Sequence, residues 1–298
     1  MNKLVSVILT THNRKPKMVK RAIESVLNQT HKNLELIIVD DSLSDFIYRN
    51  DVARMILSMN DKRIKYIQNK ENKGSCISRN IGIRISKGNY IMYLDDDDEL
   101  LPNKIKYSLD KFGSDENIGL VYSQNYVIDQ DSNKRYVRNK MISGYVFDEL
   151  IKENFVSAFP LFRRECIEEC GMFDPNMESM QDYELWLRIA QKYKLQYVAK
   201  PLVNVYLHNG KRISTNNKKK VQGAKEIYKR YEAYLDTHRS AKNARLLSLV
   251  INYARNNEFK KARRTMVQAI KTAPYRLYDN IKYTYLLYKL MMKSRIRE

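Results

Sequence analysis

The chain has 298 residues, 43% of them hydrophobic, and a net charge of +20. This length and apolar content exclude a disordered chain and allow one large or two modest domains with a buried core. The charge is uneven, because residues up to Gly210 carry 31 Lys and Arg against 28 Asp and Glu, whereas residues from Lys211 onward carry 23 against 6. The basic C-terminal part is therefore expected to meet an anionic partner, either nucleic acid or a lipid surface.

The cysteines and the apolar runs indicate where the protein works. Cys76, Cys166 and Cys170 form no CxxC pair, so neither a disulfide framework nor a zinc site is predicted, as is usual in a reducing cytoplasm. The N-terminal apolar run is too short for a signal peptide, and no stretch reaches the roughly 18 apolar residues of a membrane span. We expect a cytoplasmic protein, or one that is peripheral at a membrane.

Apolar runs of strand length alternate with helical patterns over the N-terminal third of the chain. The predicted strands are Leu4–Thr10, Leu34–Val39, Ile64–Gln68 and Tyr90–Leu94. The predicted helices between them are Pro16–Leu27, Ser44–Met59 and Ser75–Ser86. This alternation predicts an α/β fold of Rossmann-like type, with a mainly parallel central sheet and helices on both faces.

After Pro102 the alternation of strand and helix patterns becomes less regular. A strand at Ile118–Gln124, a hairpin within Tyr126–Val137, a helix at Gln181–Lys194 and one or two strands within Leu195–His208 are predicted. From Asn217 the sequence is helical in pattern, and the polar segment Asn209–Lys220 is typical of a domain boundary. The sequence thus predicts an α/β domain over residues 1–215 and a basic C-terminal α-helical extension over residues 216–298.

Polar side chains follow the predicted strands. The segments that come directly after strands are Thr10–Arg14, Asp40–Ser42, Asp95–Glu99 and His208. In open α/β sheets, ligands bind beyond the carboxyl ends of the strands. We therefore expect these groups to converge on one edge of the sheet and to form a ligand site there.

The acidic run Asp95–Glu99 indicates a metal site. Adjacent carboxylates repel one another, and a hard divalent ion such as Mn²⁺ or Mg²⁺ relieves that repulsion by taking oxygen ligands. Asp95 and Asp97 are two residues apart, so in a turn both can bind one ion. The alternative is a solvated acidic loop, but the position directly after a buried strand favours the metal site.

Three further residues each allow two interpretations. Asp41 either accepts a hydrogen bond from a uracil or ribose, or caps a helix or turn. Asp182 lies at the start of a predicted helix, where the helix dipole favours an ionised carboxylate, so it suits either a general base or a cap. His208 either completes the coordination of a metal or contacts a phosphate, or it is a surface histidine.

Five segments together resemble the ordered motifs of the family 2 inverting glycosyltransferases. The segments are Val5–Asn13, Leu36–Ser42, Asn72–Gly82, Gly88–Pro102 and Gly171–Arg188. The resemblance extends from Met1 to about His208, and five motifs in order are more specific than any one of them. It implies a GT-A fold and a nucleotide-sugar donor, usually a UDP-sugar.

The resemblance also implies roles for individual residues. Thr10, His12 and Asp41 match the segments that hold the base and ribose, and Arg79 matches a position near the nucleotide. Asp95 and Asp97 match the metal-binding DxD motif, with Asp96 near the ribose or phosphates and His208 near the metal or diphosphate. Asp182 matches the catalytic aspartate of the family's ED motif, whose first acid is replaced here by Gln181.

The implied reaction is the inverting transfer of one sugar to a hydroxyl group, in a metal-dependent glycosyltransferase of the hexosyltransferase type. The QxxRW motif of processive synthases is absent after Asp182, which favours one addition per encounter. The implied acceptor is a glycan or a polyprenyl-phosphate-linked oligosaccharide, in the synthesis of a surface polysaccharide or glycoconjugate.

The C-terminal region contains two notable patterns. Asn243–Ala273 is typical of two antiparallel helices joined near Asn256, in the manner of a single TPR-like pair. Tyr283–Met292 mixes aromatic and apolar residues with flanking Lys and Arg, which suits a helix at an anionic membrane surface. Ordinary core packing is the alternative. A membrane contact would place the protein at the inner face of the cell membrane.

Two other functions would each explain part of the sequence. A nucleotidyltransferase normally carries a glycine-rich loop after its first strand, and Thr10–Lys15 contains no glycine. A nucleic-acid-binding protein would explain the basic tail, but it leaves the acidic site unexplained. We therefore expect no nucleic acid partner.

Overall fold

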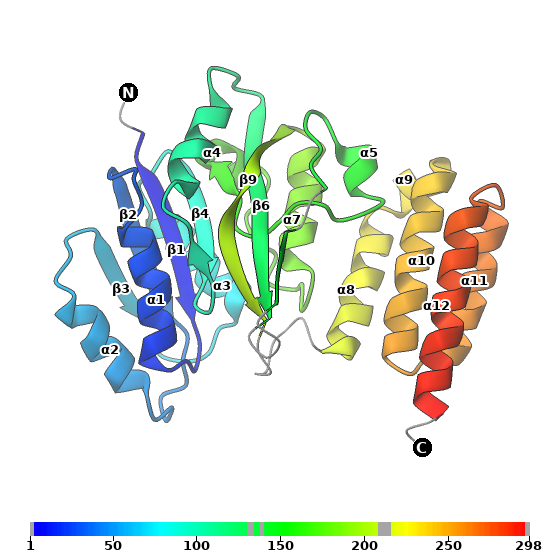
Figure 1. Cartoon of the computed structure of the whole chain (residues 1–298), viewed down its shortest axis with the longest axis horizontal. Helices are drawn as coiled ribbons and strands as arrows, with labels where there is room; N and C mark the ends of the chain where they lie inside the picture. Colours follow the sequence, from blue (N-terminus) through cyan, green and yellow to red (C-terminus); the bar gives the residue numbers. More distant parts are fainter. Residues whose placement is uncertain (1–2, 130–133, 138–139, 208–215, 296–298) are drawn as a thin grey trace. The chain divides into compact units, whose positions relative to one another are not determined.

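The computed structural model describes residues 3–129, 134–137, 140–207 and 216–295 (Figure 1). The chain forms two compact units. The first contains residues 1–146, 155–175 and 185–209, and the second contains residues 147–154, 176–184 and 210–298. The sequence placed the two internal segments, 147–154 and 176–184, in the α/β domain, whereas here they pack with the C-terminal helices.

The first unit is built on a sheet whose strands run in the order β3-β2-β1-β4-β8-β6-β9-β5. The first four strands are parallel, and they are β1 (Val5–Thr11), β2 (Leu34–Asp40), β3 (Ile64–Gln68) and β4 (Tyr90–Asp95). Continuous Val, Ile and Leu runs form β1 and β2 because both faces of a parallel sheet are covered. Thr10 pairs with both Val39 and Asp95, so the carboxyl ends of three strands meet at one edge.

The rest of the sheet is mixed rather than parallel. Its strands are β5 (Glu99–Leu100), β6 (Ile118–Asp129), β7 (Lys134–Val137), β8 (Leu161–Arg163) and β9 (Lys194–Leu207). The short β8 is antiparallel to both β4 and β6, whereas β6 and β9 are parallel. The predicted hairpin is confirmed, because Tyr126 pairs with Val137. Its turn lies outside the described residues.

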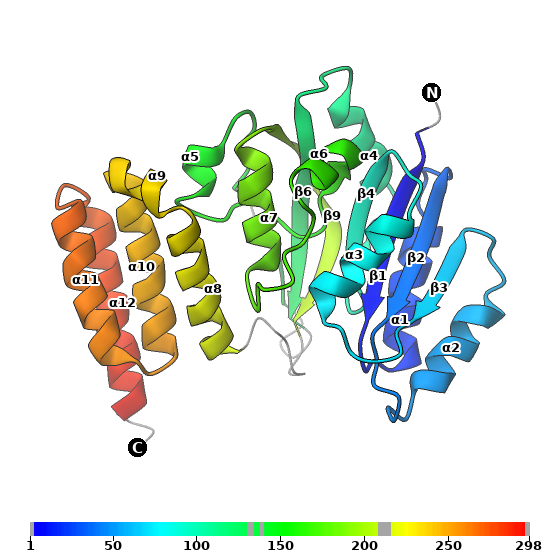
Figure 2. The ribbon, with the colours of Figure 1, turned by 180° about the vertical axis from the view of Figure 1, so that it is seen from behind.

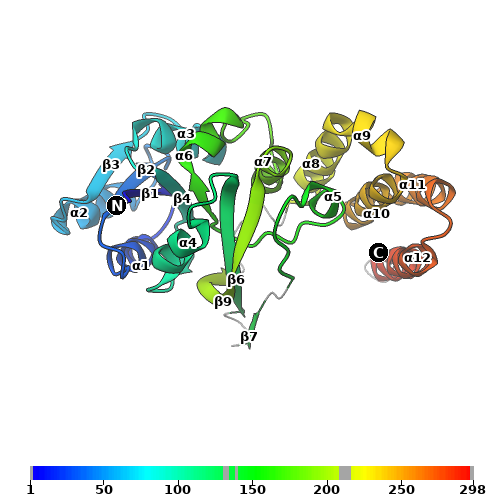
Figure 3. The same ribbon diagram turned by 90° about the horizontal axis from the view of Figure 1, so that it is seen from above.

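Helices cover both faces of this sheet, as the sequence predicts. They are α1 (Pro16–Leu27), α2 (Arg49–Ser58), α3 (Ser75–Ile85), α4 (Lys104–Phe112) and α6 (Arg164–Glu169). Figure 3 shows α1 and α4 on one face and α3 and α6 on the other. Helix α1 has the predicted bounds, because Pro16 opens it and one apolar face is fully buried. Helix α4 was not predicted, since Lys104 and Ser108 lie on its buried face and hide the apolar period.

The second unit is helical (Figure 2). Its elements are α5 (Phe147–Leu150), α8 (Asn217–Arg230), α9 (Glu232–Thr237), α10 (Arg239–Arg255), α11 (Phe259–Thr272) and α12 (Leu277–Arg295). The predicted pair is α10 and α11, joined by a turn in which Asn257 has a φ of 60°. A hydrophobic core shared by α10, α11 and α12 consists of Leu246, Leu247, Val250, Ala254, Ala262, Met266, Ala269 and Leu287. In the part of the chain that is described, no helix is long and apolar enough to cross a membrane.

Candidate functional site

The acidic run lies where β4 ends and is largely buried. Asp95 is the last residue of β4, and the exposed fractions of Asp96, Asp97 and Asp98 are only 5%, 7% and 6%. The parallel register of β1 and β4 causes this placement, because it sets Asp95 beside Thr10 at the sheet edge. Buried carboxylates are costly unless they are paired, so the surrounding cations are part of the site.

Two arginines pair with the first three carboxylates of the run, and a third, Arg21, lies 3.5 Å from Glu99 Oε1. Arg14, in the segment after β1, donates from Nε to Asp96 Oδ1 at 2.9 Å and from Nη2 to Asp97 Oδ2 at 2.9 Å. Burial lowers the pKa of Arg14, but Asp96 and Asp97 outweigh that effect and hold the pKa above its ordinary value. Arg79 of α3 donates from Nη2 to Asp95 Oδ1 at 2.7 Å, and its guanidinium lies 4.6 Å from the centre of the Tyr93 ring.

Asp96 has a perturbed acidity. Burial raises the pKa of Asp96 to about 6, against the opposing effect of Arg14 and with a further rise from the neighbouring Asp97. A carboxyl group with this pKa is mostly ionised at neutral pH but is close to its titration range. Any additional cation bound here would stabilise its charged form.

Asp41 organises the loop that leads into α3. Its Oδ1 accepts hydrogen bonds from Asn69 Nδ2 at 2.7 Å and from the Lys73 backbone N–H at 2.9 Å. Its Oδ2 accepts from the Gly74 backbone N–H at 2.8 Å, and Gly74 has a φ of 82° that favours glycine. The Asp41 carboxylate therefore fixes the loop before α3, whereas the turn at residues 40–42 is made by Asp40, whose Oδ1 accepts a hydrogen bond from the Ser42 backbone N–H at 3.0 Å.

His12 connects these groups. Its Nδ1 lies 2.8 Å from the Asp41 carbonyl oxygen and 3.0 Å from Asn72 Nδ2, and its backbone N–H donates to Asp96 Oδ2 at 3.2 Å. The His12 side chain itself is exposed at the sheet edge. The first unit thus brings seven predicted site residues to one edge of the sheet: Thr10, His12, Asp41, Arg79, Asp95, Asp96 and Asp97. Hydrogen bonds join His12 to Asp41 and Asp96, and Arg14 joins Asp96 to Asp97, whereas Arg79 pairs with Asp95.

The acidic run is also tied to β9. Asp98 Oδ1 accepts a hydrogen bond from the Tyr206 backbone N–H at 2.8 Å. Glu99 Oε2 accepts from Asn204 Nδ2 at 3.1 Å and from the Tyr206 hydroxyl, as β5 pairs with β9. His208, which the sequence predicted as a metal ligand, lies outside the described residues.

The donor set suits a hard divalent cation only in part. Among the described residues, no group of three or more His, Cys, Asp or Glu side chains is arranged to hold a metal ion. Mg²⁺-type ions, however, are commonly bound by one or two carboxylates together with the phosphate oxygens of a ligand. Asp95 and Asp97 are two such carboxylates, so the residues fit an ion that a phosphorylated ligand would complete.

Contributors to the site that were not predicted from the sequence include Arg14, Arg21, Asn69 and Asn72. The strand-end rule that selected His12 and Asp41 applies to Asn69 as well, because Asn69 directly follows β3 and donates its backbone N–H to the Asp40 carbonyl at 2.8 Å. No signal in the sequence shows that Arg14 bridges two carboxylates, since that depends on side-chain direction.

Asp182 belongs to the second unit. It is the second residue of α7 (Gln181–Ala190), and residues 181–184 belong to the second unit while residues 185–190 belong to the first. The first unit alone therefore does not contain it. Asp182 is half-buried in the first helical turn, where the helix dipole favours an ionised carboxylate. It is followed by the buried Tyr183 and Glu184.

Comparison with known sequences finds a glycosyltransferase family model and relatives named as glycosyltransferases. The family model described as "Glycosyl transferase family 2" matches residues 6–171. A putative colanic acid biosynthesis glycosyl transferase, WcaA of Escherichia coli, is 29% identical over 83% of this chain and 88% of its own length. A chondroitin synthase of Escherichia coli is 30% identical over 69% of this chain, which corresponds to 29% of the synthase.

Two solved structures share the fold. TarS of S. aureus in complex with UDP-GlcNAc has a TM-score of 0.66, covers 97% of this chain and 92% of its own, and is 14% identical. A mannosyltransferase from Pyrobaculum calidifontis, in complex with GDP-Man and Mn²⁺, has a TM-score of 0.59, covers 96% of this chain and 84% of its own, and is 16% identical. At these identities the likeness concerns the fold alone, and it agrees with the predicted GT-A architecture.

Proposed function

Because this chain belongs to glycosyl transferase family 2, we propose that it transfers a single sugar from a nucleotide-diphosphate sugar to an acceptor hydroxyl, with inversion at the anomeric carbon. The observation that carries the proposal is the network at the sheet edge, in which His12 links Asp41 to the acidic run. Ligands of open α/β sheets bind at this edge. The acceptor is a glycan or a lipid-linked oligosaccharide in polysaccharide or glycoconjugate synthesis, as the name of the WcaA relative suggests.

The donor is most simply a UDP-sugar. In this proposal Thr10, His12 and Asp41 hold the base and ribose, Arg79 approaches the nucleotide, and Asp96 lies near the ribose or phosphates. The hydrogen bonds from Lys73 and Gly74 to Asp41 support a preformed cradle, because they fix the loop before any ligand arrives. UDP-GlcNAc is bound by TarS and GDP-Man by the mannosyltransferase, so the choice of base is a question for experiment.

A divalent ion, Mn²⁺ or Mg²⁺, would be held by Asp95 and Asp97, and by His208 if it reaches the site. Such an ion neutralises the charge that develops on a leaving diphosphate. The chain itself contributes Arg14 and Arg79, whose hydrogen bonds orient the carboxylates in the site. Arg14 bonds to both Asp96 and Asp97, so it fixes their mutual geometry.

Asp182 is the proposed general base. As the acceptor oxygen forms its bond to the anomeric carbon, Asp182 takes the hydroxyl proton, and the bond to the diphosphate oxygen breaks on the opposite side. A positioned base contributes about 10²–10⁴-fold to such a reaction. The first helical turn of α7 supports an ionised carboxylate, as the base requires.

We also propose that α12 contacts a membrane surface. Exposed apolar side chains recur along α12 at intervals of three or four residues, namely Tyr278, Ile281, Tyr285, Tyr288 and Met292. Lys282 and Lys289 are exposed on the same helix. Exposed tyrosines flanked by lysines suit contact with an anionic membrane surface at the inner face of the cell membrane, where a polyprenyl-phosphate acceptor would be met.

Flotation with vesicles that contain anionic lipid tests this contact. The double variant Tyr285→Ser/Tyr288→Ser is expected to lose flotation, because both side chains are at least 60% exposed and leave the core intact. Tyr145→Ser, at a residue of the first unit that is 63% exposed, is the matched control. Equal flotation of wild type and the double variant would rule out α12 as the contact.

Nucleotide binding tests the donor site. Thermal stability is measured with UDP, GDP, CDP and ADP, each with and without Mn²⁺. A ligand at about 100 times its Kd adds about 2.7 kcal/mol to the free energy of unfolding. We expect a shift with one nucleotide, which depends on the metal. No shift with any of the four would contradict the proposed donor site.

A further inference from the structure

We propose that the helical unit positions the catalytic base, through a clamp on the first turn of α7 in which Glu184, Arg230 and Gly223 are positioning residues. This inference rests on the proposed role of Asp182. It assigns the C-terminal helices a part in the reaction that is separate from any contact with a membrane. Three independent contacts carry it, all of them within the second unit.

The first contact is a buried ion pair. Glu184 is two residues after Asp182 and only 1% exposed, and its Oε1 accepts a hydrogen bond from Arg230 Nη1 of α8 at 2.9 Å. Arg230 also bonds through Nε to Glu226 Oε1, at 3.1 Å, on the surface of the same helix. Separating a buried carboxylate from its cation is strongly unfavourable. The turn that carries Asp182 is therefore held to α8.

The second contact holds the residue between Asp182 and Glu184. Tyr183 is buried, and its hydroxyl donates to the Leu150 carbonyl at 2.7 Å. Burial raises the pKa of Tyr183, so the phenol stays a neutral donor. Arg245 of α10 lies 5.4 Å from the centre of the Tyr183 ring and donates from Nη2 to the Lys152 carbonyl at 2.6 Å. Thus α10 and the segment 147–154 enclose the same turn from another side.

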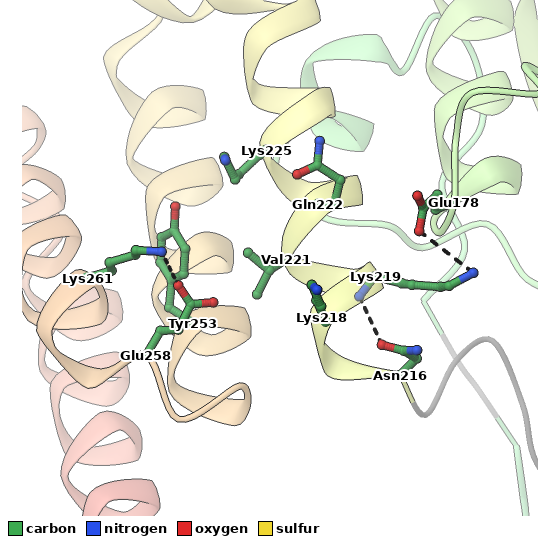
Figure 4. Close-up of a pocket in the computed structure, with 10 residues that line it drawn as sticks. All are labelled: Glu178, Asn216, Lys218, Lys219, Val221, Gln222, Lys225, Tyr253, Glu258 and Lys261. Atoms are coloured by element: carbon green, nitrogen blue, oxygen red, sulfur yellow. Dashed lines mark hydrogen bonds and ion pairs between the residues drawn. The ribbon is translucent and has the colours of Figure 1, made fainter.

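The third contact is a close approach of two backbones. A Cβ at Gly223 of α8 would lie 2.7 Å from the Ser179 carbonyl oxygen and 3.4 Å from Met180 Cγ. Met180, the residue before α7, has a φ of 61°, which is unusual for a non-glycine residue and needs support from its surroundings. Lys219 of α8 also pairs with Glu178, one residue before Ser179 in the chain, at 3.7 Å; Figure 4 shows this ion pair.

These contacts surround Asp182 in sequence on both sides, from Glu178 to Glu184. A displacement of about 1 Å of a reacting group can cost about 10²-fold in rate. Weakening the clamp is therefore expected to lower kcat while the donor site, which is in the other unit, keeps its affinity. If these residues had only a structural role, their substitution would lower the free energy of unfolding without lowering kcat at an unchanged donor affinity.

The kinetic test uses Arg230→Met, Arg230→Lys and the control Glu226→Gln, with release of nucleoside diphosphate from UDP-GlcNAc and GDP-mannose as the assay. Arg230→Met is expected to lower kcat by about tenfold or more, with the KM for the donor and the nucleotide-induced thermal shift unchanged. Arg230→Lys should recover part of the loss. Glu226→Gln, which removes only the surface partner of Arg230, should behave as wild type. A wild-type kcat in Arg230→Met would overturn the inference.

A second measurement does not depend on turnover. Hydrogen exchange is followed in the peptide that covers residues 176–186, with residues 36–42 of β2 as the internal reference. In Arg230→Met and in Gly223→Ala, exchange in the first peptide is expected to rise about tenfold, as local opening becomes easier, while the reference stays constant. Unchanged exchange would overturn the clamp. Absence of diphosphate release by the wild type, with the exchange result as expected, would instead count against the proposed function.

Discussion

The burial of Lys104 predicts how the free energy of unfolding depends on pH. It begins α4, its side chain is 0% exposed, and its Nζ donates to Ser123 Oγ at 2.9 Å. Among the described residues no carboxylate pairs with it, and burial lowers its pKa from 10.5 to about 7. The perturbation is Lys104→Met, which keeps the length of the side chain and removes the charge.

The direction in which stability changes with pH follows from the linkage between proton binding and unfolding. Between pH 7 and 10.5 the unfolded chain holds a proton on Lys104 that the folded chain has released, so stability rises with pH over this interval. At about 1.4 kcal/mol per pH unit, the full difference corresponds to about 5 kcal/mol. Lys104→Met removes this dependence. The variant should therefore be more stable than wild type at pH 6.5, and the advantage should shrink as the pH approaches 10.

Urea unfolding at pH 6.5 and 9.5 measures this directly. Lys106→Met is the matched control, because Lys106 is an exposed lysine on the same helix. The difference in the free energy of unfolding between Lys104→Met and wild type should change by several kcal/mol between the two pH values, about 3 or more. The same difference at both pH values, or an equal change in Lys106→Met, would refute the reasoning.

Three further predictions concern the site. Asp182→Asn should lower kcat by about 10²–10⁴-fold while the nucleotide-induced thermal shift is retained; near-normal turnover would mean that another group is the base. Arg14→Met should lower the free energy of unfolding by about 3–5 kcal/mol in urea, because it leaves two buried carboxylates without their shared cation; a stability equal to wild type would show that the bridge contributes nothing. Chelation with EDTA should abolish diphosphate release and Mn²⁺ should restore it, with Asp97→Asn requiring more Mn²⁺ than wild type; turnover that survives complete chelation would contradict the metal role.

The parallel half of the sheet was predictable from the sequence. Helix α1 and strand β3 have the predicted bounds, because a proline start with an amphipathic period, and a short mixed run centred on Tyr66 and Ile67, are local signals. The same local logic placed the polar segments at the strand ends, where the structure joins His12, Asp41 and the acidic run. What was predictable, therefore, was the edge of the sheet at which the site lies.

Other features depend on contacts between distant residues. Strand β8 has only three residues, too few for a periodic signal, and it becomes a strand through pairing with β4 and β6. Segment 176–184 follows the pattern of the α/β domain in sequence, yet it packs with α8 through Gly223 and Arg230. The bridge from Arg14 to two carboxylates likewise depends on side-chain direction, which no spacing in the sequence determines.

We propose that this chain releases a nucleoside diphosphate from a nucleotide sugar at the edge of the sheet. The direct measurement is diphosphate release from UDP- and GDP-sugars with Mn²⁺, compared between wild type and the double variant Asp95→Asn/Asp97→Asn. Release by wild type from donors of one base, and its loss in the double variant, is the predicted result. Equal release by both proteins, or none by wild type from any donor, would contradict the account.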